Sequence, residues 1–246
     1  MEPTYQQTFH INDHHSDRYG RLKPGSLLYF IQEVAGIHGA SLGVDHETLA
    51  KKNLFWAILR TRVQITRLPQ NGENITLKTW PMPATRVAYP RSVVAFDEAG
   101  NEIFRGISIW VLMDMTSRAM VLPGKSGVSL AGSIQGGELA IPGSLVPRTM
   151  ENMDSRAVRF TDLDVNGHMN NTKYFEWIWD LLPSQFHQDN PLRELVICYL
   201  SEAREGQNLT MNWEFSDGVF QVEGTRENEE PGKNPHRVFA AKVLFD

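Results

Sequence analysis

The chain has 246 residues, of which 41% are hydrophobic and 22% are charged, so it can form a large apolar core. This length suits one large domain or two smaller ones, and the composition excludes fibrous and largely disordered proteins. The formal net charge of −5 disfavours a nucleic-acid-binding protein, because such proteins normally carry a basic surplus. The single cysteine, Cys198, excludes an internal disulfide and a cysteine-based zinc site and suits a reducing cytosol.

The N-terminal residues and the apolar segments give no targeting or membrane signal. Residues 1–10 lack the basic start and apolar run of a signal peptide. The apolar runs are short, such as residues 27–31 and 109–113, and none approaches the roughly 20 residues needed to span a bilayer. We therefore expect a cytoplasmic protein without membrane contacts.

In the first half of the chain, one long helix is expected before a series of strands. Apolar residues recur at helical spacing between Gly25 and Gly43, and Pro24 stands where a helix would begin. Turn signals at residues 70–72 and 97–100 then separate short apolar segments that are typical of antiparallel strands. These segments are residues 54–59, 62–65, 74–80, 92–96 and 107–112.

Residues 125–147 are the part of the chain richest in Gly, Ser and Pro, and they predict a linker. This linker would separate an N-terminal domain, residues 1–124, from a C-terminal domain, residues 148–246. The tripeptide Gly124-Lys-Ser lies here, but Ala119 stands where a phosphate-binding loop needs its first glycine. The pattern of a phosphate-binding loop therefore fails.

The second half repeats the plan of the first. Residues 17–22 match residues 164–169 at an offset of 147, and residues 72–76 match residues 206–210 at an offset of 134. Two matches in the same order indicate a duplicated helix-plus-sheet unit. The second unit is expected to have a helix over residues 171–182 and strands over residues 195–200, 209–213, 219–222 and 238–245.

The second predicted helix is apolar nearly all round, so it must be buried on most sides. A helix enclosed by a curved antiparallel sheet would satisfy this requirement. Two such units side by side could merge their sheets, which would shield two sheet edges. The expected fold class is therefore α+β, with two helices that are each wrapped by an antiparallel sheet.

The most informative segment comes directly before this helix. It contains Asp164, Asn166 and His168, and Asn171 or Thr172 can cap the helix that follows. Unpaired amides of the first helical turn could bind a developing oxyanion, and the neighbouring side chains could polarise a carbonyl. A polar turn with only capping and Asx-type hydrogen bonds is the alternative.

The first copy of the repeat helps to distinguish a catalytic site from a merely structural polar turn. It has Tyr19 and Arg21 at the positions of Asn166 and His168, so the polar set belongs to one copy. Glu202, at the end of a predicted strand, is a second candidate. If residues 66–67 align with residues 203–204, the counterpart of Glu202 is Ile65, which suggests a buried acid with a perturbed pKa. The alternative explanation of Glu202 is a salt bridge to Arg204 or an exposed strand end.

Other candidates are weaker. Glu176 is expected to be a paired residue rather than a catalytic carboxylate, and Cys198 a small core residue rather than a nucleophile. Residues 13–17 have side chains that could bind a metal, but contiguous residues of this kind in a loop are usually solvated. We expect no metal ion there.

The segment Asp164-Val-Asn-Gly-His-Met-Asn-Asn-Thr-Lys-Tyr174 resembles the acyl-acyl-carrier-protein (acyl-ACP) thioesterase family. The resemblance continues through the Trp177-Ile178 helix to Glu202, and in the first half it includes residues 55–59 and 80–81. It implies a tandem hotdog fold and hydrolysis of fatty acyl-ACP thioesters in fatty acid biosynthesis, without a metal ion or an organic cofactor. The lack of a plastid transit segment fits the bacterial type.

The resemblance implies catalytic roles for Asp164, Asn166, His168 and Glu202. Plant members have a cysteine after the position of Glu202, whereas this chain has Ala203, which argues against a cysteine nucleophile. Glu202 as general base or as direct nucleophile stays open.

The implied partners are acyl carrier protein and a fatty acyl chain, and a homodimer stays open. Because acyl carrier protein is acidic, we expect a local basic patch on this acidic chain. The candidate residues are Arg60, Arg62, Arg67, Arg86, Arg91, Arg156, Arg159 and Lys173. Alternative functions are a hotdog acyl-CoA thioesterase and a non-catalytic acyl-binding module. The signature His-x-x-x-x-Pro-Gly of hotdog dehydratases is missing from the sequence.

Overall fold

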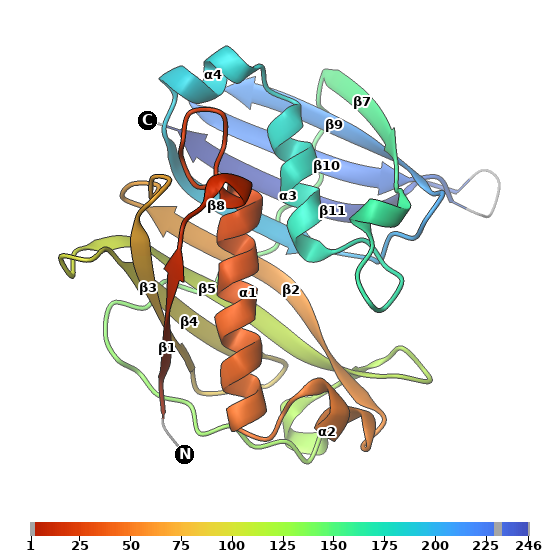
Figure 1. Cartoon of the computed structure of the whole chain (residues 1–246). Helices are drawn as coiled ribbons and strands as arrows, with labels where there is room; N and C mark the ends of the chain where they lie inside the picture. The colour runs from red at the N-terminus through yellow and green to blue at the C-terminus, as the bar shows by residue number, and fades with distance from the viewer. Residues whose placement is uncertain (1–2, 229–232, 246) are drawn as a thin grey trace. The chain divides into compact units, whose positions relative to one another are not determined.

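The computed structural model describes residues 3–228 and 233–245 of the chain. Contacts between Cα atoms divide it into two compact units, Met1–Pro142 and Gly143–Asp246. The boundary falls inside the segment 125–147 that the sequence predicts as a linker, and residues 126–151 contain no helix or strand. Each unit has its own antiparallel strands and its own main helix (Figure 1).

In the N-terminal unit the strands form a sheet in the order β1-β3-β4-β5-β2, and β6 pairs with β5. All of these pairs are antiparallel. The helix α1 has 18 residues and packs its apolar side against the sheet. The elements are β1 (Tyr5–His10), η1 (Asp13–His15), α1 (Pro24–Ser41), α2 (His46–Ala50), β2 (Leu54–Ile65), β3 (Asn74–Pro81), β4 (Tyr89–Phe96), β5 (Glu102–Asp114), β6 (Met120–Val121) and η2 (Pro123–Lys125).

In the C-terminal unit the order is β7-β9-β10-β11-β8, again with antiparallel neighbours. The helix α3 has 10 residues. Its Tyr174 packs on Phe239 of β11 and Tyr199 of β8, with ring centroids 5.1 Å and 5.8 Å apart. The elements are β7 (Asn152–Ala157), η3 (Phe160–Asp162), α3 (Asn171–Asp180), α4 (Ser184–Asp189), β8 (Leu192–Tyr199), β9 (Asn208–Ser216), β10 (Val219–Arg226) and β11 (His236–Phe245).

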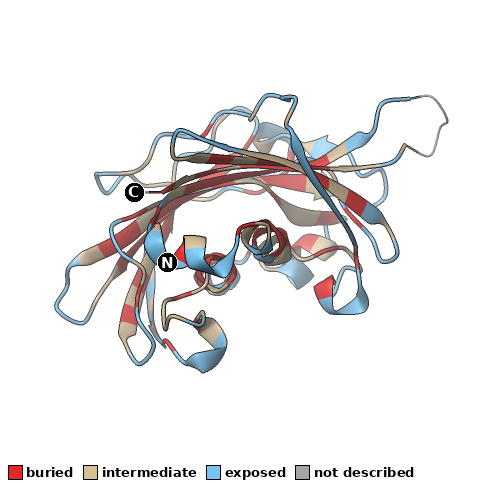
Figure 2. Ribbon diagram, turned by 90° about the horizontal axis from the view of Figure 1, so that it is seen from above, coloured by how far each residue is buried: buried red, intermediate tan, exposed pale blue. Residues whose placement is uncertain are grey.

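The two units have the same topology. In both, a first strand leads through a 3-10 helix to the main helix, and the remaining strands occupy equivalent places in the sheet order. The expected duplication and the expected α+β class, with a helix packed on an antiparallel sheet in each unit, are therefore confirmed. Buried residues line the strands and the helices in Figure 2, whereas the loops are mostly exposed.

Two parts of the strand prediction were incomplete. Residues 54–59 and 62–65 belong to one strand, β2, whose pairing with β5 shifts register between Ile58 and Arg60. β1 and β7 were not expected at all. The residues of β1 are intermediate or exposed in alternation and those of β7 are almost all exposed, so neither strand shows a buried apolar pattern.

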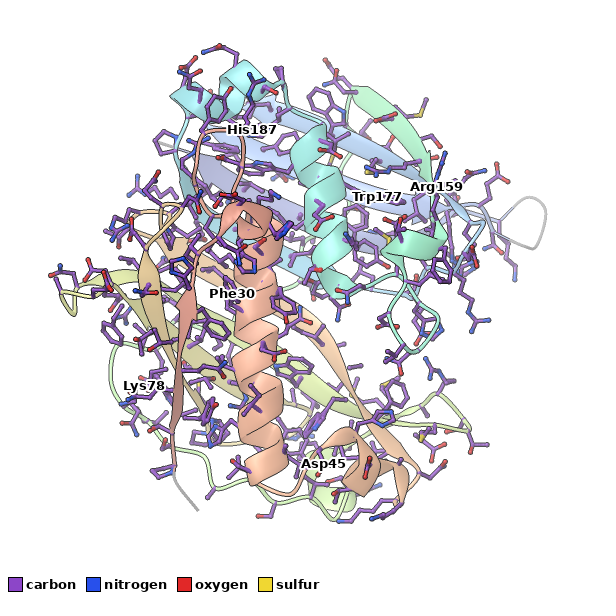
Figure 3. All side chains as sticks on the ribbon, viewed as in Figure 1. Phe30, Asp45, Lys78, Arg159, Trp177 and His187 are labelled. Atoms are coloured by element: carbon purple, nitrogen blue, oxygen red, sulfur yellow. The ribbon has the colours of Figure 1, made fainter. Side chains whose placement is uncertain are left out.

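Each main helix places a large aromatic side chain in its unit's core. Phe30 of α1 and Trp177 of α3 are 2% and 1% exposed (Figure 3). Trp177 also donates a hydrogen bond from Nε1 to Asp162 Oδ1 of η3 at 3.4 Å. Truncation of such a side chain to alanine typically costs about 3–5 kcal/mol. This anchoring keeps α3 beside η3 and beside the loop between them.

The predicted linker is attached at both of its ends. In the N-terminal unit, Ser126 Oγ hydrogen-bonds the Tyr89 hydroxyl at 2.8 Å, and Arg60 Nη1 donates to the Pro142 carbonyl at 2.9 Å. In the C-terminal unit, Arg237 Nη2 donates to the Leu145 carbonyl at 3.1 Å. The segment therefore contributes packing and hydrogen bonds to each unit. No helix in the described part of the chain is both long enough and apolar enough to cross a membrane.

Candidate active site

The candidate site is built on a tight turn between η3 and α3. The Asp164 amide donates to the His168 carbonyl at 2.8 Å, and the Gly167 amide donates to the Asp164 carbonyl at 3.0 Å. Gly167 has a φ of +75°, a left-handed conformation that glycine adopts without steric cost. The turn therefore closes on itself through its backbone.

The Asp164 carboxylate fixes this turn from inside. Its Oδ1 accepts hydrogen bonds from the amides of Asn166 at 2.8 Å and His168 at 3.5 Å. Its Oδ2 accepts a hydrogen bond from the Asn166 side-chain amide at 3.4 Å. This is the Asx-type pattern that the alternative explanation required, and it also orients Asn166 and His168.

His168 is joined to Glu202, which lies 34 positions further along the chain. His168 Nε2 lies 3.1 Å from Glu202 Oε2, and the side chains are 19% and 40% exposed. The backbone explains this contact. His168 and Arg204 form an isolated antiparallel bridge, next to which the amide of Met169 donates to the carbonyl of Ala203 at 2.8 Å. Glu202 is therefore the diagonal neighbour of His168 across this bridge.

An imidazole and a carboxylate at this distance can exchange or share a proton. The expectation that Glu202 is a buried acid was wrong. It follows the strand β8 on an exposed segment, where its contact with His168 and not its burial sets its environment.

The N-terminal unit contains the same turn without the reactive side chains. Asp17 Oδ1 accepts hydrogen bonds from the amides of Tyr19 at 2.8 Å and Arg21 at 2.9 Å. The amide of Leu22 then donates to the carbonyl of Pro69 at 2.8 Å. The scaffold of the turn is thus common to both units, and only the C-terminal unit combines Asn166 and His168 in it.

These hydrogen bonds show that the alignment of Glu202 with Ile65 was wrong. The Leu22 amide donates to the Pro69 carbonyl as the Met169 amide donates to the Ala203 carbonyl. Ala203 therefore corresponds to Pro69, and Glu202 corresponds to Leu68. Both units also have a bulge here, in which one carbonyl accepts two consecutive amides. In the N-terminal unit these amides belong to residues 66–67, and in the C-terminal unit to residues 200–201. The contrast between an acid and an apolar residue remains, but it involves Leu68.

The cap of α3 differs from both sequence candidates. Asn170, and not Asn171 or Thr172, is the N-cap residue, and its side-chain oxygen accepts the Thr172 amide at 2.9 Å. The Lys173 amide donates to the Asn170 carbonyl at 2.9 Å. Because these two first-turn amides already have partners, they are poor candidates for binding an oxyanion. The side-chain amide of Asn166 is a better candidate for this donor than these two backbone amides.

The weaker candidates lie elsewhere in the C-terminal unit. Glu176 pairs with Lys173, with 2.8 Å between Oε2 and Nζ. Cys198 is fully buried in β8, so it is a core residue and not an accessible nucleophile. Within residues 3–228 and 233–245, no three His, Cys, Asp or Glu side chains gather closely enough to hold a metal ion.

Tyr174 is a site neighbour that the sequence did not suggest. It is 3% exposed, and its ring packs on Tyr199 and Phe239. Burial raises the pKa of Tyr174 well above its usual value, and the negative charge of Asp164 raises it further, so the phenol stays neutral. The repeat contained a signal for this residue, because the offset of 147 pairs Tyr174 with the apolar Leu27.

The fold and the polar turn together define a class, the tandem hotdog proteins with a His–Glu pair in the second unit. Two family descriptions match the chain, the acyl-ACP thioesterase N-terminal domain over residues 2–122 and its C-terminal domain over residues 147–240. The chain belongs to the acyl-ACP thioesterase family.

Known structures of this family are similar over the full chain. A crystal structure of an acyl-ACP thioesterase from Bacteroides thetaiotaomicron has a TM-score of 0.89 and 25% sequence identity, and the match covers 99% of this chain and 98% of that one. The 12:0-ACP thioesterase from Umbellularia californica has a TM-score of 0.83 at 20% identity, with 100% and 98% covered. Both matches support the tandem hotdog fold.

Plant enzymes are similar in sequence. A palmitoyl-acyl carrier protein thioesterase of Gossypium hirsutum is 26% identical over 214 residues, and an oleoyl-acyl carrier protein thioesterase of Arabidopsis thaliana is 23% identical over 221 residues. These matches include 80% and 82% of this chain, but 52% and 61% of the plant proteins. The chain therefore spans little more than half the length of these relatives.

Proposed function

We propose that the protein hydrolyses the thioester of fatty acyl-ACP in the cytoplasm and releases free fatty acid and holo-ACP for fatty acid biosynthesis. The observation that carries this proposal is the 3.1 Å contact between His168 and Glu202 beside Asn166, in a chain of the acyl-ACP thioesterase family. The named plant relatives act on acyl carrier protein thioesters, which supports the same substrate class here.

Asn166 is the proposed donor to the thioester oxygen. When water attacks the carbonyl carbon, this oxygen gains negative charge, and an amide N–H that points at it stabilises the transition state by a few kcal/mol. The Asn166 side chain is exposed and held only by a long hydrogen bond of 3.4 Å to Asp164. An amide has two N–H donors, so one can serve the substrate while the other binds Asp164.

The pair of His168 and Glu202 is the proposed carrier of protons. It takes one proton from the attacking water as the bond between water oxygen and carbonyl carbon forms. When the tetrahedral intermediate breaks the C–S bond, the pair returns this proton to the departing thiolate, and the products are a fatty acid and a thiol. Asp164 acts by holding the backbone of Asn166 and His168 in place.

A direct attack by Glu202 would give an acyl-enzyme anhydride instead. The two routes differ in where oxygen from solvent is incorporated. In a single turnover in water labelled with ¹⁸O, the general-base route places the label in the fatty acid, whereas the anhydride route leaves label in the Glu202 carboxylate when water attacks the glutamyl carbonyl. We favour the general-base route, because Glu202 Oε2 already contacts the imidazole.

The docking of acyl carrier protein is proposed to use exposed basic residues of the C-terminal unit. Several of the candidates have other roles: Arg91 is 8% exposed, Arg156 pairs with Asp180 at 3.0 Å, and Lys173 pairs with Glu176. Arg159 is exposed and lies at the start of η3, close to the turn of His168 (Figure 3). It is therefore the first candidate for contact with an acidic carrier protein.

The test is steady-state hydrolysis of matched acyl-ACP and acyl-CoA substrates, with products identified by mass spectrometry. We expect a clear preference for acyl-ACP. We also expect His168→Ala and Glu202→Ala to remain folded and to lose activity by about a hundredfold or more, because general acid–base groups contribute on that scale.

Glu205→Ala is the matched control, because it removes another exposed acid of the same segment. It should keep wild-type rates. Preference for acyl-CoA would replace the substrate assignment. Near-wild-type rates for His168→Ala and Glu202→Ala would refute the catalytic assignment, and binding of acyl-ACP without turnover would identify a non-catalytic acyl-binding module.

A further inference from the structure

Two backbone segments, residues 158–160 and 204–207, border the candidate site together. Val158 exchanges two backbone hydrogen bonds with the second segment, each 2.9 Å long. Arg204 in that segment forms an isolated antiparallel bridge with His168. These two segments, which we call the site rim, are therefore attached to each other and to the turn that contains His168.

The N-terminal unit has the same two segments, residues 11–13 and 70–73. Ile11 exchanges two backbone hydrogen bonds with the second of them, each 2.8 Å long. Arg21 and Gln70 form the bridge that corresponds to the one between the site rim and its turn. Because the backbone is matched in this way, the N-terminal unit shows which other side chains the same scaffold accepts.

The side chains at these matched positions differ in charge. The N-terminal unit has Asn12, Asp13, Gln70 and Glu73 where the C-terminal unit has Arg159, Phe160, Arg204 and Gln207. The site rim therefore has arginines in place of two amides and uncharged residues in place of two acids. The opposite change occurs at Glu205, which corresponds to Asn71. On balance, the site rim is the more positive of the two surfaces, which favours an acidic partner.

Phe160 is the most exposed aromatic residue in the described part of the chain. It is 77% exposed, whereas the next one, Tyr29, is 49% exposed. Phe160 begins η3 as Asp13 begins η1, and Asp13 is exposed as well. The 3-10 helix therefore forms with an acid at this position, and its folding does not explain an aromatic ring in contact with water.

The composition of the site rim fits a protein partner. Aromatic residues and arginine are enriched at the centres of protein–protein interfaces, where a few of them supply most of the binding energy. Arg159 and Arg204 are both exposed, one in each segment of the rim, and Arg159 directly precedes Phe160. An exposed ring and two cations thus lie on segments that adjoin the turn of His168.

We propose that the site rim is the docking surface for acyl carrier protein, with Phe160 as its apolar anchor and with Arg159 and Arg204 as contacts for acidic residues of the carrier. This inference rests on the proposed function, because it assumes the acyl-ACP substrate. It also explains how the enzyme would distinguish acyl-ACP from acyl-CoA. Both substrates present a pantetheine arm, but acyl-CoA has a nucleotide in place of the protein surface that would cover Phe160.

The first experiment compares Phe160→Asp with Met153→Asp. Each variant replaces an exposed apolar residue of the C-terminal unit by an acid, and the two residues are 77% and 73% exposed. Asp13 indicates that the turn accepts aspartate at position 160. We expect Phe160→Asp to raise the ratio of the KM for acyl-ACP to the KM for the matched acyl-pantetheine by about tenfold or more, as is usual for the loss of an interface anchor. Met153→Asp should keep the wild-type ratio.

The second experiment tests the two arginines by salt dependence. Arg159→Asn and Arg204→Gln copy the residues of the N-terminal unit, so both should fold. We expect each to lower kcat/KM for acyl-ACP several-fold at low ionic strength and to have less effect at about 1 M salt, where charge attraction is screened. Arg86→Asn, which removes an exposed arginine of the other unit, should keep the wild-type salt dependence. Equal salt dependence in all four proteins would contradict a role for these charges.

A measurement without turnover separates this proposal from the proposed function. Apo-ACP, which has no arm and no thioester, should bind the wild type and Met153→Asp equally in calorimetry and should bind Phe160→Asp about tenfold more weakly. If the wild type is inactive on thioesters but shows this difference, the proposed function fails and the docking surface stands.

Three outcomes would overturn the docking surface itself. In the first, apo-ACP does not bind the wild type or binds both aspartate variants equally. In the second, Phe160→Asp raises the KM for acyl-ACP and for acyl-pantetheine by the same factor, which would place Phe160 against the arm. In the third, sedimentation shows a wild-type dimer that Phe160→Asp separates while apo-ACP binding is unchanged, which would make the site rim a contact between two copies of this chain.

Discussion

At the scale of single residues, the backbone of Asn166 has a structural role and its side chain has the proposed chemical role. Its backbone amide closes the turn by binding Asp164 at 2.8 Å, whereas its side chain projects into solvent with one long hydrogen bond. The side chain can therefore be removed without loss of the turn. The corresponding residue of the other unit, Tyr19, uses the same backbone bond with a different side chain.

We expect Asn166→Ala to keep the unfolding free energy of the wild type and to lower kcat by about a hundred- to a thousandfold, as is usual when a donor to an oxyanion is lost. Urea unfolding and steady-state kinetics on acyl-ACP measure both quantities. Val165→Ala, which alters a fully exposed neighbour, is the control and should change neither. A kcat of Asn166→Ala close to the wild-type value would assign the oxyanion to another donor.

The residue types of the site could be predicted from the sequence, but their environments could not. The spacing of Asp164, Asn166 and His168 is short enough that one turn must hold them together. The burial of Glu202 depended on its alignment with the other unit, and a two-residue likeness placed it opposite Ile65. The longer match at residues 72–76 and 206–210 gives Leu68, in agreement with the hydrogen bonds.

At the scale of elements, the turn before each main helix is a complete unit of structure. In both copies an aspartate carboxylate accepts two amides of its own turn, and a glycine with positive φ follows, Gly20 at +77° and Gly167 at +75°. The strands β1 and β7 lie at one end of their sheets and have few buried residues. Periodicity could not reveal them, because an edge strand needs backbone pairing more than an apolar face.

The duplicated turn allows a matched comparison of stability and activity. Asp164→Ala and Asp17→Ala each remove hydrogen bonds to a charged acceptor, and we expect each to lower the unfolding free energy by about 1.5–3 kcal/mol. Only Asp164→Ala should also lower kcat, by about tenfold or more, because its turn holds Asn166 and His168. An equal loss of kcat in Asp17→Ala would show that the turn matters for general folding alone.

At the scale of the whole molecule, the duplication was predictable because two separate matches occur in the same order. The boundary between the units was less well defined by composition. The segment 125–147 is rich in Gly, Ser and Pro, yet parts of it pack on each unit, and the contact boundary falls after Pro142. Composition indicates how flexible a segment is as an isolated chain, but it does not indicate whether the segment packs on a folded unit.

Two buried tyrosines give the molecule a predictable response to alkaline pH. Burial raises the pKa of Tyr174 and of Tyr199 above the ordinary value of 10.0. Above about pH 10, these groups keep their protons in the folded protein and lose them in the unfolded chain, so their contribution to stability falls as the pH rises. Below about pH 10 it is fully present.

We expect the unfolding free energy, measured in urea between about pH 8 and about pH 11, to fall less steeply at the alkaline end in Tyr199→Phe than in the wild type. Tyr29→Phe, which removes an exposed tyrosine, should keep the wild-type slope. The same slope in all three proteins would show that the buried phenols ionise as easily as exposed ones.

The two closely similar turns have a consequence for how such a protein can change. Each turn is stabilised by its aspartate, its glycine and its backbone hydrogen bonds. The side chains of Asn166 and His168 therefore contribute little to the stability of the fold. Mutations of Asn166 and His168 should therefore affect mainly the catalytic activity. Mutations of Asp164 and Gly167 should affect mainly the stability of the fold. A library that varies residues 166 and 168 alone should yield mostly well-expressed proteins, which makes this turn a convenient starting point for the design of new hydrolytic activities.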